Sequence, residues 1–261
     1  MTEASAAIAV VSASKSYGHD SRKVLDQVSL AVADREFLAV VGPSGSGKTT
    51  LLRLVNRLID PTEGRVLVGG EDVRTVDPIA LRRRIGYVFQ GVGLFPHMTV
   101  AENIGITPRL LGQDAAAIAR RVDELIDLVR LDKASHAGRF PHELSGGERQ
   151  RVGVARALAA HPRIVLMDEP FGALDPLTRD ALAQDYRRLH ESFGLTTVMI
   201  THDMTEALLL ADRIAVMRNG RLVAEGTPQD MMAHTTDDFV NEMMQTPRRQ
   251  AERLDALKAK R

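Results

Sequence analysis

The sequence has no cysteine and no tryptophan, and it contains no long uninterrupted hydrophobic stretch. The lack of cysteine excludes disulfide bonds, thiolate catalysis and cysteine-ligated metals, and it fits a cytosolic protein. No segment approaches the roughly 18 apolar residues that a membrane-spanning helix needs. The start, MTEASAAIAVVSASKSYG, lacks the basic region and the sustained apolar core of a signal peptide. Any membrane role is therefore expected to come through a partner.

The charges are also balanced, because 34 Lys and Arg residues match 34 Asp and Glu residues. This balance lacks the basic excess that is typical of nucleic-acid binding, so no nucleic-acid partner is expected. A hydrophobic content of 44% and a charged content of 26% are ordinary for a globular protein. The 261 residues suffice for one large α/β domain, or for a core with a smaller lobe.

The stretch VVGPSGSGKTTLL, residues 40–52, is the strongest local signal in the chain. It matches G-x-x-x-x-G-K-[ST] at every position, between an apolar run at Phe37–Val41 and a helical pattern, which is the context that this phosphate-binding motif requires. Its glycines permit backbone conformations in which successive N–H groups face an anion, and the helix dipole adds positive potential. Lys48 would reach the β- and γ-phosphates and the Thr49 hydroxyl would bind Mg²⁺. A glycine-rich loop without a ligand is the disfavoured alternative, since strand, loop and helix all match.

The segment before this loop predicts two short strands, Ile8–Ser12 and Val28–Val32. Because they lie close together in the sequence, we expect an antiparallel hairpin or edge sheet. Tyr17 lies between them, and its ring could stack on an adenine base because aromatic faces stack with little regard to hydrogen-bond pattern. Packing of this ring on the sheet edge is an equally good interpretation of the residue alone.

Further strands and turns alternate with helical segments along the rest of the chain, which predicts an α/β fold with a mostly parallel core sheet. The expected strands are Val66–Val68, Ile85–Phe89, Ile164–Met167 and Thr197–Ile200, followed by a hairpin of Ile214–Met217 and Leu222–Ala224 around an Asn-Gly turn.

The sequence changes character after Gln90, where GVGLFPHMTVAENI predicts a loop with exposed Leu94, Phe95 and Met98. A helix follows whose apolar residues recur at 3.6 spacing while its other side is charged. These apolar residues are Ile118, Val122, Leu125, Ile126 and Val129. We interpret roughly residues 91–160 as a helical subdomain inserted in the α/β core.

Within this subdomain, ELSGGERQRVGVARALAAHP contains a second turn of small residues that opens onto a helix. Val152, Ala155, Leu158 and Ala159 form the apolar side of that helix. The helix N-terminus after Ser145 is a second candidate anion site by the same dipole argument. A turn followed by a helix is common, so this pattern alone is only moderate evidence for an anion site. The phosphate loop at residues 42–50 strengthens it.

The run Ile164–Met167 is bounded by charge and proline, as a buried parallel strand should be, and Asp168 and Glu169 follow it. Ligands of doubly wound sheets bind at such carboxyl ends. Alternation along the strand would send the two carboxylates to different sides. Asp168 would then hold Mg²⁺, and Glu169 would orient the attacking water or accept its proton. Two solvated acids at an exposed strand end are the alternative if no phosphate site lay nearby.

His202 closes the strand Thr197–Ile200, in the same sheet as the phosphate loop, and would donate to a γ-phosphate. The last residues, PRRQAERLDALKAKR, predict a basic tail that is helical or loose and solvated. The expected organisation is one domain over residues 1–235 and a short basic tail over 236–261.

The order and spacing of these motifs resemble the nucleotide-binding subunit of ATP-binding cassette (ABC) transporters over about residues 8–235. The matching motifs are Tyr17, GPSGSGKTT, Gln90, LSGGE, LMDEP, the GALD of Gly172–Asp175, and His202. The resemblance implies a P-loop NTPase fold with an N-terminal antiparallel β subdomain and an inserted α-helical subdomain. It also implies two cassettes stacked head to tail, either as a homodimer or with a close homologue. Each ATP would lie between the phosphate loop of one cassette and the LSGG turn of the other.

The resemblance implies a role for each matching residue. Tyr17 would stack on adenine, and the phosphates would be bound by Gly42, Pro43, Ser44, Gly45, Ser46, Gly47, Lys48, Thr49 and Thr50. Mg²⁺ would be held by Thr49, Gln90 and Asp168. Catalysis would rest on Glu169 as general base, His202 as γ-phosphate sensor and Lys48. Across the interface, Ser145, Gly146 and Gly147 would contact the nucleotide and Asp175 would couple the two sites.

Family members dock on transmembrane permease subunits at the cytoplasmic face of the membrane, and a solute-binding protein acts indirectly. This resemblance implies the same peripheral location here, with Leu94, Phe95 and Pro96 as docking contacts. A hydrophobic pivot within the helical subdomain is an almost equally good interpretation of those three residues. Glu148 and Gly172 depart from the family's usual glutamine and serine, but neither position supplies phosphate chemistry.

Three longer segments are similar to the ATPases of osmoprotectant importers, which take up glycine betaine, choline or carnitine. They are VNRLIDPTEGRVLVGGEDV, LRRRIGYVFQGVGLFPHMTVAENI and DMTEALLLADRIAVMRNGRLVAEGTP. Many of those ATPases carry regulatory modules after the cassette, a layer of control expected to be missing or to lie elsewhere in this case. Because no ATPase subunit touches the solute, an importer of another small solute, such as an amino acid, is the alternative.

Other nucleotide-dependent proteins fit less well. A GTPase would need a guanine-reading Asn-Lys-x-Asp, which is absent, and too few residues separate Thr49 from Ser145 for the coiled-coil arms of a chromosome-maintenance ATPase. A translation-associated cassette protein usually carries two cassettes in one chain. A scaffold that binds nucleotide without turnover is disfavoured because both Glu169 and His202 are present. A non-transport ABC ATPase is the less favoured alternative.

Overall fold

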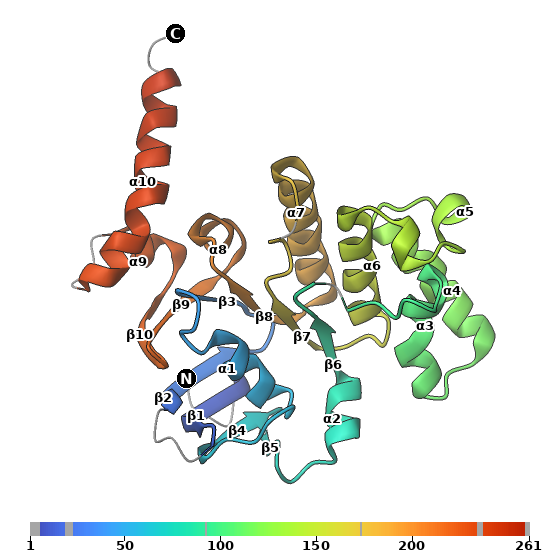
Figure 1. Cartoon of the computed structure of the whole chain (residues 1–261), viewed down its shortest axis with the longest axis horizontal. Helices are drawn as coiled ribbons and strands as arrows, with labels where there is room; N and C mark the ends of the chain where they lie inside the picture. Colours follow the sequence, from blue (N-terminus) through green and yellow to red (C-terminus); the bar gives the residue numbers. More distant parts are fainter. Residues whose placement is uncertain (1–5, 19–22, 92, 173, 234–236, 259–261) are drawn as a thin grey trace.

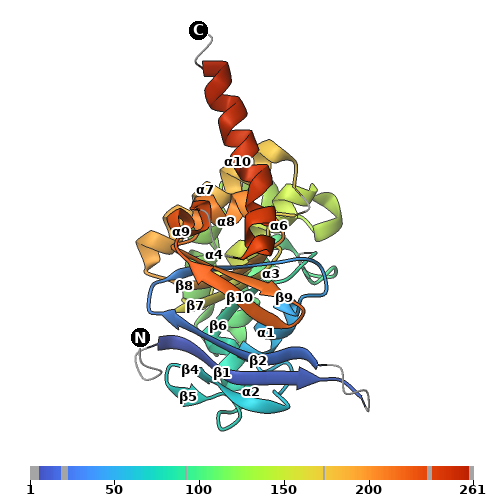
Figure 2. The same cartoon turned by 90° about the vertical axis from the view of Figure 1, so that its left-hand side faces the viewer.

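The computed structural model describes residues 6–18, 23–91, 93–172, 174–233 and 237–258, and Figures 1 and 2 show it from two directions. The strands are β1 Ala6–Ser16, β2 Lys23–Ala33, β3 Phe37–Val41, β4 Glu63–Val68, β5 Glu71–Asp72, β6 Ile85–Val88, β7 Ile164–Asp168, β8 Thr196–Thr201, β9 Arg213–Arg218 and β10 Arg221–Gly226. The helices are α1 Lys48–Val55, α2 Pro78–Arg84, α3 Val100–Leu110, α4 Ala115–Leu128, α5 Lys133–His136, the 3₁₀ helix Pro141–Glu143, α6 Gly146–Leu158, α7 Pro176–Phe193, α8 Met204–Leu210, α9 Pro228–Met232 and α10 Asp238–Lys258.

The larger sheet has the strand order β10-β9-β3-β8-β7-β6. In the described residues β3 pairs in parallel with β8 and β9, and β7 pairs in parallel with β6 and β8. The antiparallel exception is the hairpin of β9 and β10, which turns at Asn219 and Gly220 with φ angles of 50° and 78°. The predicted mostly parallel core sheet is therefore confirmed.

Strand β3 divides the interior into two hydrophobic clusters. Phe37, Ala39 and Val41 pack on one face of the sheet with α6, α7 and α8. Leu38 and Val40 pack on the other face with α1 and the second sheet. Because both faces of the strand are buried, its sequence is continuously apolar, and for the same reason its bounds are those expected from the sequence.

The second sheet is antiparallel, with the order β2-β1-β4-β5, and forms the predicted N-terminal β subdomain. Its first two strands are longer than the expected Ile8–Ser12 and Val28–Val32, since each has 11 residues. Ser12 and Gln27 have φ angles of 46° and 49°, and the register shifts around them. Such bulges interrupt the alternation of buried side chains on which the sequence prediction depended.

Helices α3 to α6 form a lobe beside β6 at one end of the core sheet, within the predicted range 91–160 (Figure 1). Val122, Leu125 and Ile126 of α4 are buried in the hydrophobic cluster, as the 3.6 spacing predicts. At the other end of the molecule, α10 extends away from the body in both views (Figures 1 and 2). No helix in the described ranges combines the length and the apolar character that crossing a membrane requires.

Candidate functional site

The phosphate loop runs from the carboxyl end of β3 into α1, and two of its glycines admit no side chain. A Cβ on Gly42 would lie 2.2 Å from the carbonyl oxygen of Met217, and one on Gly47 would lie 2.7 Å from Leu25 Cδ2. Gly42, Gly45 and Gly47 have φ angles of 150°, 79° and 101°. The loop is therefore held open as a backbone cradle by glycine at these positions.

The cradle carries polar groups whose local partners leave room for an anion. The Lys48 ammonium donates to the carbonyl oxygens of Gly42 (2.8 Å) and Pro43 (3.0 Å). Burial lowers the pKa of Lys48, while the charges of Glu169 and Asp168 act in the opposite direction. The Ser46 hydroxyl is buried without a hydrogen-bond partner. A buried orphan hydroxyl and a desolvated ammonium are both groups that a phosphate would satisfy.

Thr49 and Asp168 provide adjacent oxygen atoms beside the cradle. Thr49 Oγ1 donates to Asp168 Oδ1 at 3.2 Å, although the two residues belong to α1 and β7. Burial raises the pKa of Asp168, and the neighbouring Glu169 charge raises it further, against the hydrogen bond from Thr49. A buried carboxylate beside a hydroxyl and another acid is a donor set that suits Mg²⁺. Among the described residues, no group of three or more His, Asp and Glu side chains forms a metal cluster.

Glu169 leaves the strand rather than continuing its alternation. β7 ends at Asp168, and Glu169 has a φ of 45° with its N–H on the carbonyl oxygen of Ile200. The left-handed backbone of Glu169 explains why the carboxylates of Asp168 and Glu169 point to different places. We had expected the alternation of side chains along the strand to separate them. Glu169 Oε2 accepts a hydrogen bond from Gln90 Nε2 (3.1 Å) and lies 3.5 Å from His202 Nδ1. The side-chain amide of Gln90, which was predicted to be a metal ligand, thus donates a hydrogen bond to the Glu169 carboxylate.

The second predicted anion site is a separate hollow. Ser145 caps α6 in a capping box with Glu148, in which the hydroxyl accepts from Glu148 N (3.2 Å) and Ser145 N donates to the carboxylate (2.7 Å). His136 lies 3.0 Å from the same carboxylate, and this contact, followed by the bonds to Ser145, lowers the pKa of Glu148 to about 2. A hollow of about 360 Å³ opens there. Its lining is Ser145, Gly146, Gly147, Glu148, Arg151, Leu174, Asp175 and Thr178.

None of the lining residues of this hollow belongs to the phosphate loop, so the two candidate anion sites are separate within the chain. Asp175, predicted to couple them, caps α7 by accepting from Thr178 N (3.1 Å). Gly172 of the same loop lies near His202, since a Cβ there would be 3.8 Å from the His202 ring. Ala173, between them in the GALD motif, lies outside the described residues.

The remaining predicted contacts are spread around the cradle. Tyr17 follows β1 and is 48% exposed, with the Lys15 ammonium 5.3 Å from its ring centre. Pro43 and Ser44 are exposed at the tip of the phosphate loop. Thr50 is buried in α1. One face of the tyrosine ring is thus close to a cation, and the side chain is accessible from solvent.

A groove of about 460 Å³ lies between the helical lobe and the core sheet and is lined by α2, β6, α3 and α6. Its lining includes Leu58, Phe89, Phe95 and Leu110, all at least 41% exposed. Of the three predicted docking residues, Phe95 lines this groove, Pro96 is exposed, and Leu94 packs on the hydrophobic cluster as the pivot interpretation requires.

Sequence reasoning missed Arg156, which stands at the floor of this groove. Its guanidinium donates to the carbonyl oxygen of Gly93 (2.7 Å) and lies 5.9 and 6.0 Å from the ring centres of Phe89 and Phe95. Arg156 is 8% exposed, and burial lowers its pKa. The available signal was a single charge in the otherwise apolar run VARAL of α6.

These features define a phosphate-loop protein with an acid-tipped neighbouring strand and a second, separate hollow at a helix N-terminus. The ABC transporter family model matches residues 25–172, which is more than half of the chain. The chain belongs to the ABC transporter family.

Three curated relatives show its place in that family. The chain is 47% identical over 231 residues to the choline transport ATP-binding protein OpuBA of Bacillus subtilis, covering 88% of this chain and 60% of that protein. It is 45% identical to the glycine betaine uptake system ATP-binding protein YehX of Escherichia coli (88% and 73% covered). It is 50% identical to the sulfate/thiosulfate import ATP-binding protein CysA of Caulobacter vibrioides (86% and 66% covered). The chain thus spans about three fifths of the length of OpuBA.

A solved structure shares the fold. The dimeric, post-hydrolysis state of the ATP-binding cassette MJ0796 bound to ADP and Pi superposes with a TM-score of 0.78 at 33% sequence identity. The match covers 85% of this chain and 98% of that chain. The expected cassette fold, with its antiparallel N-terminal sheet and parallel-rich core sheet, is therefore confirmed.

Proposed function

We propose that this chain is the ATP-hydrolysing subunit of an importer and that it works as a dimer around two Mg-ATP. The observation that carries the proposal is the meeting of Gln90, Glu169 and His202 beside the phosphate loop and the Thr49–Asp168 pair. These residues come from four separate segments of the chain, namely α1 and the ends of β6, β7 and β8. A site that only held phosphate would not need the carboxylate and imidazole at this place.

In the proposed reaction, a water oxygen attacks the γ-phosphorus of ATP and the bond to the bridging oxygen of ADP breaks. Glu169 Oε2 takes the proton of that water, and Gln90 Nε2 holds the carboxylate in place through the 3.1 Å hydrogen bond. Lys48 and the loop N–H groups bind the β- and γ-phosphates, and the His202 imidazole beside Glu169 contacts the γ-phosphate. Mg²⁺ bound at Thr49 and Asp168 would neutralise phosphate charge.

The dimer follows from the separation of the two anion sites. The hollow at Ser145, Gly146 and Gly147 shares no lining residue with the phosphate loop, so a second copy facing the first is what would bring both onto one nucleotide. Hydrolysis breaks the bond between the γ-phosphate and ADP, and release of the phosphate then removes negative charge from that shared site and weakens the interface. The dimeric cassette structure to which this chain is similar supports the arrangement.

The groove at Phe89, Phe95 and Leu110 is the proposed docking site for a transmembrane permease subunit. Exposed aromatic and aliphatic side chains gathered in one concave groove are suited to receive the apolar face of a short helix. Docking there would place the chain peripherally at the cytoplasmic face of a membrane. A solute-binding protein would act through the permease and not on this chain.

For the solute we propose a quaternary amine osmoprotectant such as glycine betaine or choline. The support is the similarity to the choline and glycine betaine ATP-binding proteins. The comparable identity to a sulfate/thiosulfate import protein favours, as the second candidate, an importer of another small solute, because the cassette carries no solute contact.

The proposed hydrolysis is tested by steady-state ATPase assay of the wild type against Glu169→Gln. The amide keeps the size of the side chain but cannot take a proton, so the rate should fall by about 100-fold or more while ATP binding is kept. Equal rates for the two proteins would contradict the assignment of Glu169, and a wild type without Mg-ATP turnover would contradict the proposed function.

A further inference from the structure

Helices α7 and α8 are joined by a set of polar contacts that the proposed reaction does not use. Arg179 lies one turn inside α7, and its Nη2 donates to the carbonyl oxygen of Leu174 at 3.2 Å. Its backbone N–H donates to the carbonyl oxygen of Asp175 at 2.9 Å. The Arg179 side chain is therefore tied to Leu174, which with Asp175 lines the hollow at Ser145, and the backbone bond to Asp175 is the first hydrogen bond of α7.

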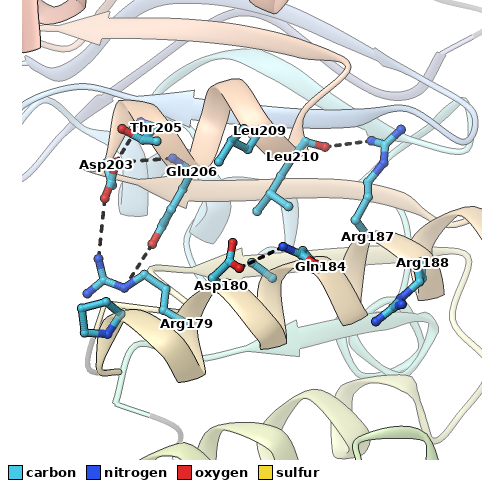
Figure 3. A pocket seen from close by; sticks show the side chains of 12 residues that line it. Arg179, Asp180, Gln184, Arg187, Arg188, Asp203, Thr205, Glu206, Leu209 and Leu210 are labelled. Carbon is cyan, nitrogen blue, oxygen red and sulfur yellow. Dashed lines mark hydrogen bonds and ion pairs between the residues drawn. The ribbon is translucent and has the colours of Figure 1, made fainter. Parts of the chain in front are cut away.

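The other side of the Arg179 guanidinium faces the start of α8 (Figure 3). Nη1 lies 3.6 Å from Asp203 Oδ2, and Nε lies 3.7 Å from Glu206 Oε1. Both separations are those of ion pairs and are too long for hydrogen bonds. Nε is moreover buried without a hydrogen-bond partner. A shift of less than about 1 Å would convert these ion pairs into charge-assisted hydrogen bonds.

Asp203 and Glu206 in turn form hydrogen bonds with Thr201, at the end of the strand that leads to His202. Thr201, the residue before His202, donates its hydroxyl proton to Glu206 Oε2 at 2.6 Å and accepts from Asp203 N at 3.0 Å. Thr201 is 2% exposed and Glu206 is 9% exposed, so these bonds are shielded from water. His202 thus lies in sequence between Thr201 and Asp203, and both of these residues are linked to Arg179, Thr201 through Glu206 and Asp203 directly.

The packing beside the network leaves room for such a shift. A hollow of about 490 Å³ lies between α7 and α8 and is lined by Arg179, Ala183, Arg187, Glu206 and Leu209 among others (Figure 3). Buried residues of α7 and α8 share the hydrophobic cluster beneath this hollow, and the ion pairs of Arg179 add a polar connection at its His202 end.

We propose that Arg179 is a positioning residue that transmits the placement of Leu174 and Asp175, at the start of α7, to His202 through Asp203 and Glu206. This inference rests on the proposed function, because Leu174 and Asp175 would face the second cassette in the dimer. When the partner settles against them, α7 draws Arg179 onto the two carboxylates, and Thr201 and His202 follow. Hydrolysis is then coupled to the closed dimer and not to ATP binding alone.

Arg187 provides a matched control on the same helix and the same wall of the hollow. It pairs with Glu191 and Asp212 and donates to the carbonyl oxygen of Leu210, at the far end of α8 from His202. Its side chain is 27% exposed against 31% for Arg179. Arg187→Gln therefore removes an equally exposed α7–α8 link that does not involve the His202 strand end.

The experiment compares kcat, KM and the melting temperature of Arg179→Gln, Arg179→Lys and Arg187→Gln in Mg-ATP hydrolysis. We expect Arg179→Gln to lower kcat by about tenfold with KM unchanged, because the phosphate cradle is untouched. Arg179→Lys should recover part of kcat, since an ammonium can still pair with the acids. Arg187→Gln should lower the melting temperature without lowering kcat. A wild-type kcat in Arg179→Gln, or the same loss of kcat in Arg187→Gln, would overturn the inference.

Glu206→Gln gives a second measurement if Arg179→Gln does not fold, because the amide still accepts from Thr201 but cannot pair with a cation. It should lower kcat alone, and an unchanged kcat would again contradict the coupling. The His202 ring signals in a nuclear magnetic resonance spectrum separate this inference from the proposed function. Arg179→Gln should shift them and Arg187→Gln should not, even in a wild type that proved to hydrolyse nothing. Unshifted His202 signals in Arg179→Gln would refute the coupling itself.

Discussion

Thr49 Oγ1 donates a 3.2 Å hydrogen bond to Asp168 Oδ1 across 119 positions of the chain. The hydroxyl follows the phosphate loop on α1, and the carboxylate ends the buried strand β7. The fold thus brings two oxygen ligands together at the edge of the phosphate cradle, where the charge of Mg-ATP would lie.

Replacing Asp168 by asparagine should weaken nucleotide binding in a way that depends on Mg²⁺. The amide keeps the contact with Thr49 but lacks the negative charge that a divalent cation needs. We expect the Kd for ATP to rise by about tenfold in Mg²⁺ and to stay near the wild-type value in a chelator. Equilibrium binding of a fluorescent ATP analogue in both buffers measures this, and an equal change in the two buffers would refute the metal role.

Replacing Lys48 by alanine should weaken ATP binding itself. Its buried ammonium is held against the phosphate loop by the hydrogen bonds that it donates to the carbonyl oxygens of Gly42 and Pro43. Loss of a desolvated charge that pairs with phosphate should raise the Kd for ATP by about tenfold or more. Lys133→Ala is the control, since that lysine is 53% exposed on the helical lobe. An unchanged Kd in Lys48→Ala would count against the cradle assignment.

Acidification should destabilise the protein through His190. This ring is buried against Phe37 and lies 3.0 Å from Thr197 Oγ1, and burial lowers its pKa from the ordinary 6.5. The unfolded chain therefore takes up a proton near pH 6.5 that the folded chain resists, so this stability is present above pH 6.5 and is lost as the pH falls through the lowered pKa.

Urea unfolding between pH 7.5 and pH 5.5 tests this prediction. The free energy of unfolding should fall by at most about 1.4 kcal/mol per pH unit for one such proton. His161, whose pKa is also lowered by burial, should add to the fall. His190→Gln should show a smaller slope than the wild type, and identical slopes would mean that His190 does not titrate on unfolding in this range.

Replacing Phe95 by serine should weaken stimulation of ATP hydrolysis by the permease while leaving the basal rate of the isolated chain intact. Phe95 is 41% exposed and lines the groove with Phe89 and Leu110, and the groove lining contains none of the proposed nucleotide contacts. Met232→Ser is the control, because Met232 is also 41% exposed but lies on α9. The ATPase rate with the reconstituted permease is the measurement. Equal stimulation of both variants would place docking elsewhere.

The parts of the site that a continuous motif defines were predictable from sequence. Strand β3 and the glycines at 42, 45 and 47 follow from local rules, because both faces of the strand are buried and the loop needs positive φ angles. The order of the motifs also sufficed to expect Asp168 near Thr49.

What the sequence did not reveal depends on contacts between distant segments. The left-handed conformation of Glu169, which turns its carboxylate onto Gln90, has no local signal because glutamate rarely adopts it. Arg156 and Arg179 look like ordinary charges of amphipathic helices, and only packing shows that one stands under the groove and the other between α7 and α8. The bulges at Ser12 and Gln27 were hidden for the same reason.

The central claim is that the phosphate loop of one copy meets the Ser145 turn of another around ATP. Because the chain has no cysteine, a pair of introduced cysteines reports on this contact without background. Ser44 and Gly146 are suitable positions, since both are exposed and a Cβ at Gly146 meets no atom within 4 Å.

The decisive measurement is disulfide formation in a mixture of Ser44→Cys and Gly146→Cys, each in the Glu169→Gln background to prevent turnover. The account predicts that Mg-ATP drives a crosslink between one chain of each kind, seen as a band at twice the 28.6 kDa of the monomer. Nucleotide-free protein should give far less of this band. A mixture that stays monomeric in Mg-ATP would contradict the account.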